Sequence, residues 1–351
     1  MSERLRDLLG ADGGEGPVVT RRQALAALGG GGLSLGAGKA VDNVFVGYGV
    51  LVGTNLLEED LAAYAAERLQ RRRRYAALTD RHRVRLDGSR LSVHRGKASP
   101  ATLSLPGTTV EEAREVDDDL GLSRDPLSQL VADLGAVADG RVRFEFSQYP
   151  AFFERLRSGE PRPFTVGALR GPFDGVSPGQ VAALTGADPA RPEAVVEGLA
   201  TGFREHTSYD VARYAAGSVE DNLLFGAVDL RRHFESPTSF EALLADRTSG
   251  MFCYEFAWRS LEALQAVPAH RQSVPVFGGV VTDGRHKHAY TAVASAVREG
   301  GDLVVPVTFV DYTHSTLYDD LALRGVLGEG LKAYDDRHRT DGIYWHRYAA
   351  V

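Results

Sequence analysis

Two runs of apolar and β-branched residues near the C-terminus predict a β-hairpin. The first covers residues 286–297 and the second, Leu-Val-Val-Pro-Val-Thr-Phe-Val-Asp, covers residues 303–311. The glycine-containing stretch between them is typical of a turn. With Glu299-Gly300 as a two-residue loop, His288 would lie directly opposite Asp311, with Cβ atoms about 4.5–5.5 Å apart on one face. A register shift of one residue would put these two side chains on opposite faces.

Pro306 lies inside the second run. Because proline has no N–H to donate, we expect an unpaired stretch or a bulge in the ladder beside it.

A helix is predicted to begin at Cys253. From Phe256 the apolar residues recur with a helical period, and Pro268 ends the pattern. Ser249-Gly250 supplies an entry turn and a candidate cap. A cysteine in the first turn faces unpaired N–H groups and the positive end of the helix dipole, which favours the thiolate and offers a donor to an oxyanion.

Cys253 is the only cysteine of the chain, and His288 and Asp311 follow it in order. A thiol, an imidazole and a carboxylate are the three groups that a thiolate nucleophile needs. Taken singly, each has a simpler interpretation: a lone cysteine often packs as a small hydrophobic residue, and a lone histidine is often satisfied by its neighbours. Order, helix start and hairpin together favour a catalytic triad.

These three motifs resemble those of the transglutaminase-like superfamily of papain-type cysteine enzymes. In that family a cysteine begins a helix, a His-Ala-aromatic stretch opens a strand, and an aspartate closes the next strand. The matching stretches are Gly-Met-Phe-Cys253-Tyr-Glu, His288-Ala-Tyr-Thr-Ala-Val and Phe-Val-Asp311-Tyr-Thr. Tyr290 stands where the family commonly has tryptophan, and Tyr312 where it commonly has proline. The resemblance implies an α+β fold in which the cysteine helix packs on an antiparallel sheet.

The implied chemistry is acyl transfer from a peptide or side-chain amide, with Cys253 as nucleophile, His288 as proton carrier and Asp311 as its orienting group. Water as acceptor makes a peptidase or amidase, and an amine makes a cross-linker. No cofactor or metal is expected for this chemistry. The alternative from another class is an inactive binding or scaffold module of the cell envelope.

A metal site is the chemical competitor. His286, His288, Asp311 and His314 form His-x-His followed by Asp-x-x-His. Because alternate residues of a strand share a face, His286 and His288 could both point at one ion. A hydrolase built this way would not need Cys253.

Composition limits the partners. The chain has 351 residues, 43% of them hydrophobic, so it can hold two modest domains. Its net charge is −7 and its basic residues are four lysines and 36 arginines. No basic surface emerges from the sequence, so a protein or peptide substrate is expected and nucleic acid is not. A single cysteine forbids an internal disulfide.

The N-terminal residues 1–55 resemble a twin-arginine export signal. Arg21-Arg22 precedes a glycine-rich, weakly apolar stretch, and the next apolar run, Val44 to Val52, is too short to span a bilayer. The expected location is outside the cytoplasm or at the membrane, with membrane association through this segment. The alternative is an ordinary Arg-Arg pair before an alanine helix of a cytoplasmic protein.

The rest of the chain predicts an α+β region over residues 56–165 and a transglutaminase-like domain over 166–351. The predicted elements are strands within 82–105, helix within 109–139, a strand at 141–147, and helices from 176 through 194–205 and 219–234. The four arginines at 71–74 suit a solvated face or an anionic lipid surface.

Overall fold

The computed structural model describes residues 74–87, 90–105, 107–147, 149–170, 175–222, 229–283, 288–313 and 342–345. Helices and strands are mixed along the chain, which confirms the predicted α+β class. The chain divides into two compact units. The smaller includes Asp210–Ser236, and the larger includes all the strands of the described residues.

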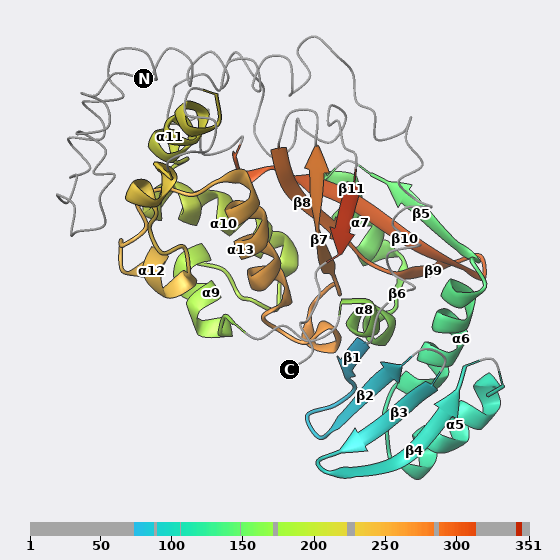
Figure 1. Cartoon of the computed structure of the whole chain (residues 1–351). Coiled ribbons are helices and arrows are strands. Elements are labelled where there is room, and N and C mark those ends of the chain that lie inside the picture. The colour runs from blue at the N-terminus through green and yellow to red at the C-terminus, as the bar shows by residue number, and fades with distance from the viewer. Residues whose placement is uncertain are drawn as a thin grey trace, which may run out of the picture. The chain divides into compact units, whose positions relative to one another are not determined.

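A seven-stranded sheet forms the centre of the larger unit (Figure 1). Its strands follow the order β11-β7-β8-β10-β9-β6, with β5 paired to β10. Neighbours are antiparallel, apart from the parallel pair β5 and β10. The bounds are β5 Val142–Phe146, β6 Glu160–Pro161, β7 Phe277–Asp283, β8 His288–Ala294, β9 Val297–Glu299, β10 Asp302–Val310 and β11 Gly342–Trp345. The strand predicted over 141–147 is thus confirmed as β5.

The predicted hairpin forms, but its register differs from the prediction. Glu299 pairs with Asp302, so the loop is Gly300-Gly301, with φ of 59° and 93°. Positive φ at both central positions defines the favoured two-residue turn and selects glycine, whereas Glu299 would be strained there. The ladder between β8 and β10 ends at the pair Thr291–Val310, before either His288 or Asp311 is reached. The prediction that His288 lies directly across from Asp311 is therefore wrong by two residues.

Pro306 interrupts the ladder as expected. Pairing of β10 with β8 stops at Val307, and pairing with β9 starts at Val304. In the gap, the carbonyl of Pro306 accepts from the Ser295 N–H at 3.1 Å. On its other edge, Pro306 is in register with Glu145 of β5.

Helices cover both faces of this sheet (Figure 1). On one face a buried apolar cluster joins Val293, Val304 and Val310 of the strands to five helices. These are α7 Tyr149–Ser158, α9 Pro178–Thr185, α10 Pro192–His206, α12 Phe240–Leu244 and α13 Cys253–Gln265. On the other face a second cluster joins Tyr290 and Phe309 to α6 Pro126–Ala138 and α8 Pro163–Arg170.

A second sheet precedes the first in the chain and runs as an antiparallel meander. Its strands are β1 Arg74–Ala77, β2 His82–Asp87, β3 Arg90–Arg95 and β4 Ala98–Ser104. Alternate residues are buried, as Val84 and Leu86 show, and they pack with residues of α5 Val110–Asp119 and α6. The strands predicted within 82–105 are confirmed.

Two helices, α5 and α6, replace the one helical stretch predicted within 109–139. Arg124 and Asp125 have positive φ, which breaks the helical path between them. Asp117, near the end of α5, then accepts from the N–H groups of Leu127 and Ser128 at 2.9 and 3.0 Å. It thereby provides the hydrogen-bond acceptor that these N–H groups in the first turn of α6 lack within the helix.

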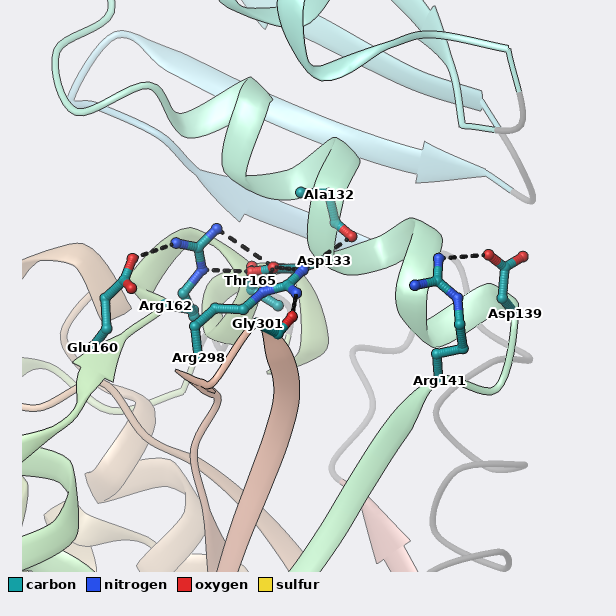
Figure 2. Close-up of polar contacts among 9 residues, drawn as sticks. All are labelled: Ala132, Asp133, Asp139, Arg141, Glu160, Arg162, Thr165, Arg298 and Gly301. Atoms are coloured by element: carbon teal, nitrogen blue, oxygen red, sulfur yellow. Dashed lines mark hydrogen bonds and ion pairs between the residues drawn. The ribbon is translucent and has the colours of Figure 1, made fainter.

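A buried carboxylate ties α6 to the seven-stranded sheet (Figure 2). The Asp133 side chain is completely buried, and its two oxygens accept from Arg162 at 2.8 Å, from Arg298 at 2.8 and 2.9 Å, and from the Thr165 hydroxyl. Arg298 also donates to the carbonyl of Gly301 in the hairpin loop. The predicted domain boundary near residue 165 stays a prediction, although β5 and β6, which precede it, pair with β10 and β9.

The described part of the smaller unit contains α11 Val211–Asn222 and the 3₁₀ helix η2 Arg231–Phe234. Ala216 and Phe234 pack together, and Arg231 pairs with Glu220 at 2.9 Å. Of the helix predicted over 219–234, residues 219–222 belong to α11, which begins eight residues earlier, and residues 231–234 form η2; residues 223–228 lie outside the described part of the chain.

Candidate functional site

Cys253 is the first residue of α13, as predicted. The predicted cap is wrong, because the residue at the N-cap position is Phe252 rather than Ser249. Glu255 takes the capping role, and its carboxylate accepts from the Phe252 N–H at 2.7 Å. A carboxylate in the first turn also complements the positive end of the helix dipole.

The thiol side of α13 packs against the strands that lead to His288. Cys253 is half-buried and contacts the apolar cluster of Ala257, Leu261, Val280 and Ala289. Ala289 directly follows His288 in β8. The start of the helix and the start of the strand are therefore neighbours in space.

An aromatic pair starts at the residue that follows Cys253 in α13. Tyr254 is 54% exposed, and its ring stacks on that of Trp258 with centroids 6.0 Å apart and planes at 24°. Because the two residues are four apart on α13, they form one apolar strip along the first turns of the helix.

His288 opens β8, where its backbone pairs with Asp283 of β7. The odd positions of β8 face α13: the Thr291 and Ser260 hydroxyl oxygens are 2.7 Å apart, and Ala289 belongs to the cluster that Cys253 contacts. By register, His288 belongs to the alternate set with Tyr290 and Ala292, which pack in the core of the opposite face. The His288 side chain itself lies outside the described residues, so its distances to Cys253 and Asp311 stay predictions.

Asp311 directly follows the last residue of β10. It is 1% exposed, and one carboxylate oxygen accepts from the Thr313 N–H at 2.8 Å. Asp311 thus lies at the end of a strand, as predicted, and is buried there. Its pairing with His288 stays a prediction.

The two residues that depart from the transglutaminase-like motif are core residues. Tyr290 is 1% exposed and packs edge to face on Phe309 at 5.8 Å. Tyr312 is equally buried, its hydroxyl donates to the Val196 carbonyl at 3.4 Å, and its ring meets Phe203 at 5.3 Å. Burial raises the pKa of the Tyr312 phenol well above its ordinary value. Both tyrosines are therefore part of the packed interior.

The metal alternative concerns residues that are only partly described. Among the described residues, no group of three or more His, Cys, Asp or Glu side chains could hold a metal ion. His286 and His314 lie outside them, so this alternative stays a prediction.

The sequence reasoning missed a buried charged pair on α13. Arg259 and Glu262 are three residues apart and 2.5 Å from each other, and the Glu262 side chain is only 7% exposed. Burial raises the pKa of Glu262 to about 7, and the charge of Arg259 opposes this shift. The Arg-x-x-Glu spacing was the available signal, but spacing does not reveal burial.

We expect Glu262 to make the protein less stable as the pH rises from about 4.5 to 7. The carboxyl pKa is raised on folding, so over this interval the unfolded chain has already lost the proton that the folded chain keeps. Ionisation therefore favours unfolding, by about 3 kcal/mol at pH 7 and above. The free energy of unfolding can be measured with urea at several pH values. In Glu262→Gln it should lack the decrease between pH 4.5 and 7 that Glu262 causes. The control is Glu241→Gln, at an exposed pair with Arg247, which should keep the pH dependence of the wild type. The same pH dependence in all three proteins would contradict the role given to Glu262.

Comparison with known proteins yields no family model, no curated protein and no solved structure that matches this chain. Within the described residues, no helix has the length and apolar character needed to cross a membrane. The export-like segment around Arg21-Arg22 lies outside them.

Proposed function

We propose that this chain is a transglutaminase-like enzyme that performs thiol-dependent acyl transfer or hydrolysis on a peptide or side-chain amide. The observation that supports this most is the position of Cys253, the only cysteine. It begins α13 and packs on the cluster that contains Ala289, the neighbour of His288. The architecture supports the α+β class of this proposal, and the transglutaminase-like fold is part of what is proposed.

In the proposed reaction, the Cys253 sulfur attacks the amide carbonyl and His288 takes the thiol proton. The Cys253 N–H at the start of α13 donates to the oxyanion. His288 then gives the proton to the leaving amine, which departs and leaves a thioester on Cys253. Water or a second amine attacks the thioester carbon and loses a proton to His288. The C–S bond then breaks, the acyl product leaves, and the Cys253 sulfur recovers the proton from His288, whose imidazole Asp311 orients. The strip of Tyr254 and Trp258 offers an apolar surface to a substrate side chain next to the scissile amide.

A second candidate is a binding or scaffold module without turnover. The register of β8 favours it, because His288 falls in the alternate set with Tyr290 and Ala292 rather than with the positions that face α13. In this case Cys253 is a half-buried packing residue with ordinary reactivity.

Alkylation rates distinguish the two candidates. If Cys253 is an activated thiol, iodoacetamide at pH 7 should label it at least about ten times faster than a cysteine peptide. His288→Ala should remove most of this acceleration, because the imidazole no longer takes the thiol proton. The rates can be read from the mass of the intact protein over time.

The control is His233→Ala, at an exposed histidine of η2, which should leave the rate unchanged. A wild-type rate no faster than that of the peptide, or equal rates with and without His288, would favour the scaffold module.

We further propose that the chain acts outside the cytoplasm or at the membrane. The Arg21-Arg22 pair and the glycine-rich stretch support this location. Fractionation of cells that express a variant with both arginines replaced by lysine tests it, since an unchanged distribution would favour the cytoplasmic alternative.

A further inference from the structure

Basic residues are concentrated in the strands β1–β4, and acidic residues in the two helices that follow them, α5 and α6. Residues 74–105 contain seven Lys or Arg and two Asp, whereas residues 106–140 contain nine Asp or Glu and two Arg. The chain as a whole has a net charge of −7. A basic segment inside an acidic chain is a local feature that the overall composition conceals.

The fold gathers part of this positive charge on one side of the sheet. Val84, Leu86, Leu91 and Val93 point into the core, so the alternate positions form the outer side. We call Arg83, Arg85, Arg90 and His94 the basic face. Arg83 is directly opposite His94 in the ladder between β2 and β3, and Arg90 is opposite Asp87.

Two arginines of the basic face are open to solvent, and its positive charge is in excess. Arg83 and Arg90 are exposed, Arg85 and His94 half-buried. The two carboxylates of the strand segment are already engaged, Asp87 with Arg85 at 3.2 Å and Asp80 with Arg271.

Three more exposed cations, Arg81, Arg95 and Lys97, lie at one end of the same strands. Burial first, and then the charges of Arg95 and Arg81, lower the pKa of His82 beside them. The charges of Arg81 and Arg95 therefore act on His82, a buried residue of the sheet.

The helices of this region have the opposite sign. Glu111, Glu112, Glu115, Asp118 and Asp119 of α5 are all exposed. Helices α5 and α6 cover one face of the sheet (Figure 1), and by register the arginines lie on the other. An anionic surface would attract the sheet side and repel the helix side, which would orient the region.

We propose that the basic face binds the anionic headgroups of a lipid membrane. It has three guanidinium groups, and those of the exposed Arg83 and Arg90 can each pair with a phosphate. In the sequence, the arginines at 71–74 precede β2, and the apolar run of residues 44–52 lies further upstream. Clustered basic residues are typical of binding to anionic lipid, and the membrane location proposed above would bring this face close to it.

Lipid fits this surface better than nucleic acid does. The outer positions of β2, β3 and β4 contain Arg, Asp, Ser, His and Thr, and by register β1 adds one aromatic residue, Tyr75 opposite Arg85. Sheets that bind single-stranded nucleic acid typically stack about two or three bases on several aromatic side chains. The expectation that the chain lacks a basic surface was wrong for this face, because residues that alternate in sequence gather only when strands pair.

The test measures binding of the full chain to vesicles. Sedimentation with phosphatidylcholine vesicles that contain about 30% phosphatidylglycerol should show binding that pure phosphatidylcholine does not, and it should weaken as salt rises from about 0.05 to 0.5 M. The variant Arg83→Gln with Arg90→Gln should bind about 25-fold more weakly, since each basic residue near an anionic leaflet contributes about five-fold. Both side chains are exposed, so its thermal midpoint should not change.

The matched control, Arg204→Gln with Arg232→Gln, removes the same charge from exposed positions outside this region and should bind within about two-fold of the wild type. Equal losses in both double variants would show a general charge effect and overturn the proposal. So would equal binding to both vesicle types, or binding of an oligonucleotide by the basic face with no preference for anionic vesicles. None of these results depends on the thiol chemistry of Cys253.

Discussion

Replacing Cys253 with serine is expected to reduce acyl transfer by at least about 10³-fold. A serine hydroxyl is a far weaker acid than a thiol, and the proposed histidine base is matched to a thiol. Loss of one member of a nucleophile, base and orienting group removes most of the rate, since the three act as a unit. The measurement is release of a fluorescent amine from a set of peptide amides, together with incorporation of a labelled amine into casein.

A chelator separates this mechanism from the metal alternative. With a thiolate at Cys253, treatment with EDTA should leave the rate unchanged. If an ion held by His286, His288 and Asp311 activates water, Cys253→Ser should instead be mild, and chelation should remove metal and activity together. Stoichiometric zinc that leaves with the activity would overturn the thiol mechanism.

Replacing Asp133 with asparagine is expected to lower the free energy of unfolding by about 3 kcal/mol or more. The carboxylate is fully buried between Arg162 and Arg298, and its removal leaves two guanidinium groups facing a neutral amide. Breaking a buried ion pair by removing one partner typically costs about 3–5 kcal/mol. Urea unfolding followed by circular dichroism should show a lower midpoint with an unchanged slope.

Asp139→Asn is the matched control. Asp139 lies at the end of the same helix and pairs with Arg141 at 2.8 Å, but both side chains are more than half exposed (Figure 2). Exposed pairs contribute about 0–1 kcal/mol, so this variant should unfold close to the wild type. Similar midpoints for the two variants would show that Asp133 does not hold α6 to the sheet.

The elements of the candidate site were predictable because local signals determine them. The helical period from Phe256 and the stop at Pro268 place α13, which begins at Cys253 as expected. The glycines at 300 and 301 mark the turn between two β-branched runs, and Pro306 predicts the gap in the ladder. Each of these signals acts within a few residues.

The register of the hairpin and the cap of α13 were harder to predict from the sequence. Two adjacent glycines allow more than one two-residue loop, and only the pairing of Glu299 with Asp302 selects one. The sequence offers Ser249 as a cap, yet Glu255 takes that role, since Phe252 rather than Ser249 reaches the N-cap position. Such choices depend on the competition between neighbouring conformations in the folded chain.

By itself, the sequence determined the α+β class, the start of α13 at Cys253 and the position of Asp311 at a strand end. Only the tertiary structure decided what lies far apart along the chain: β5 beside β10, Asp133 between Arg162 and Arg298, and the open face of Arg83 and Arg90. The physical reason is that periodicity and turn chemistry are local. Partners across a sheet, and the burial of a charge, are selected by the packing free energy of the whole core.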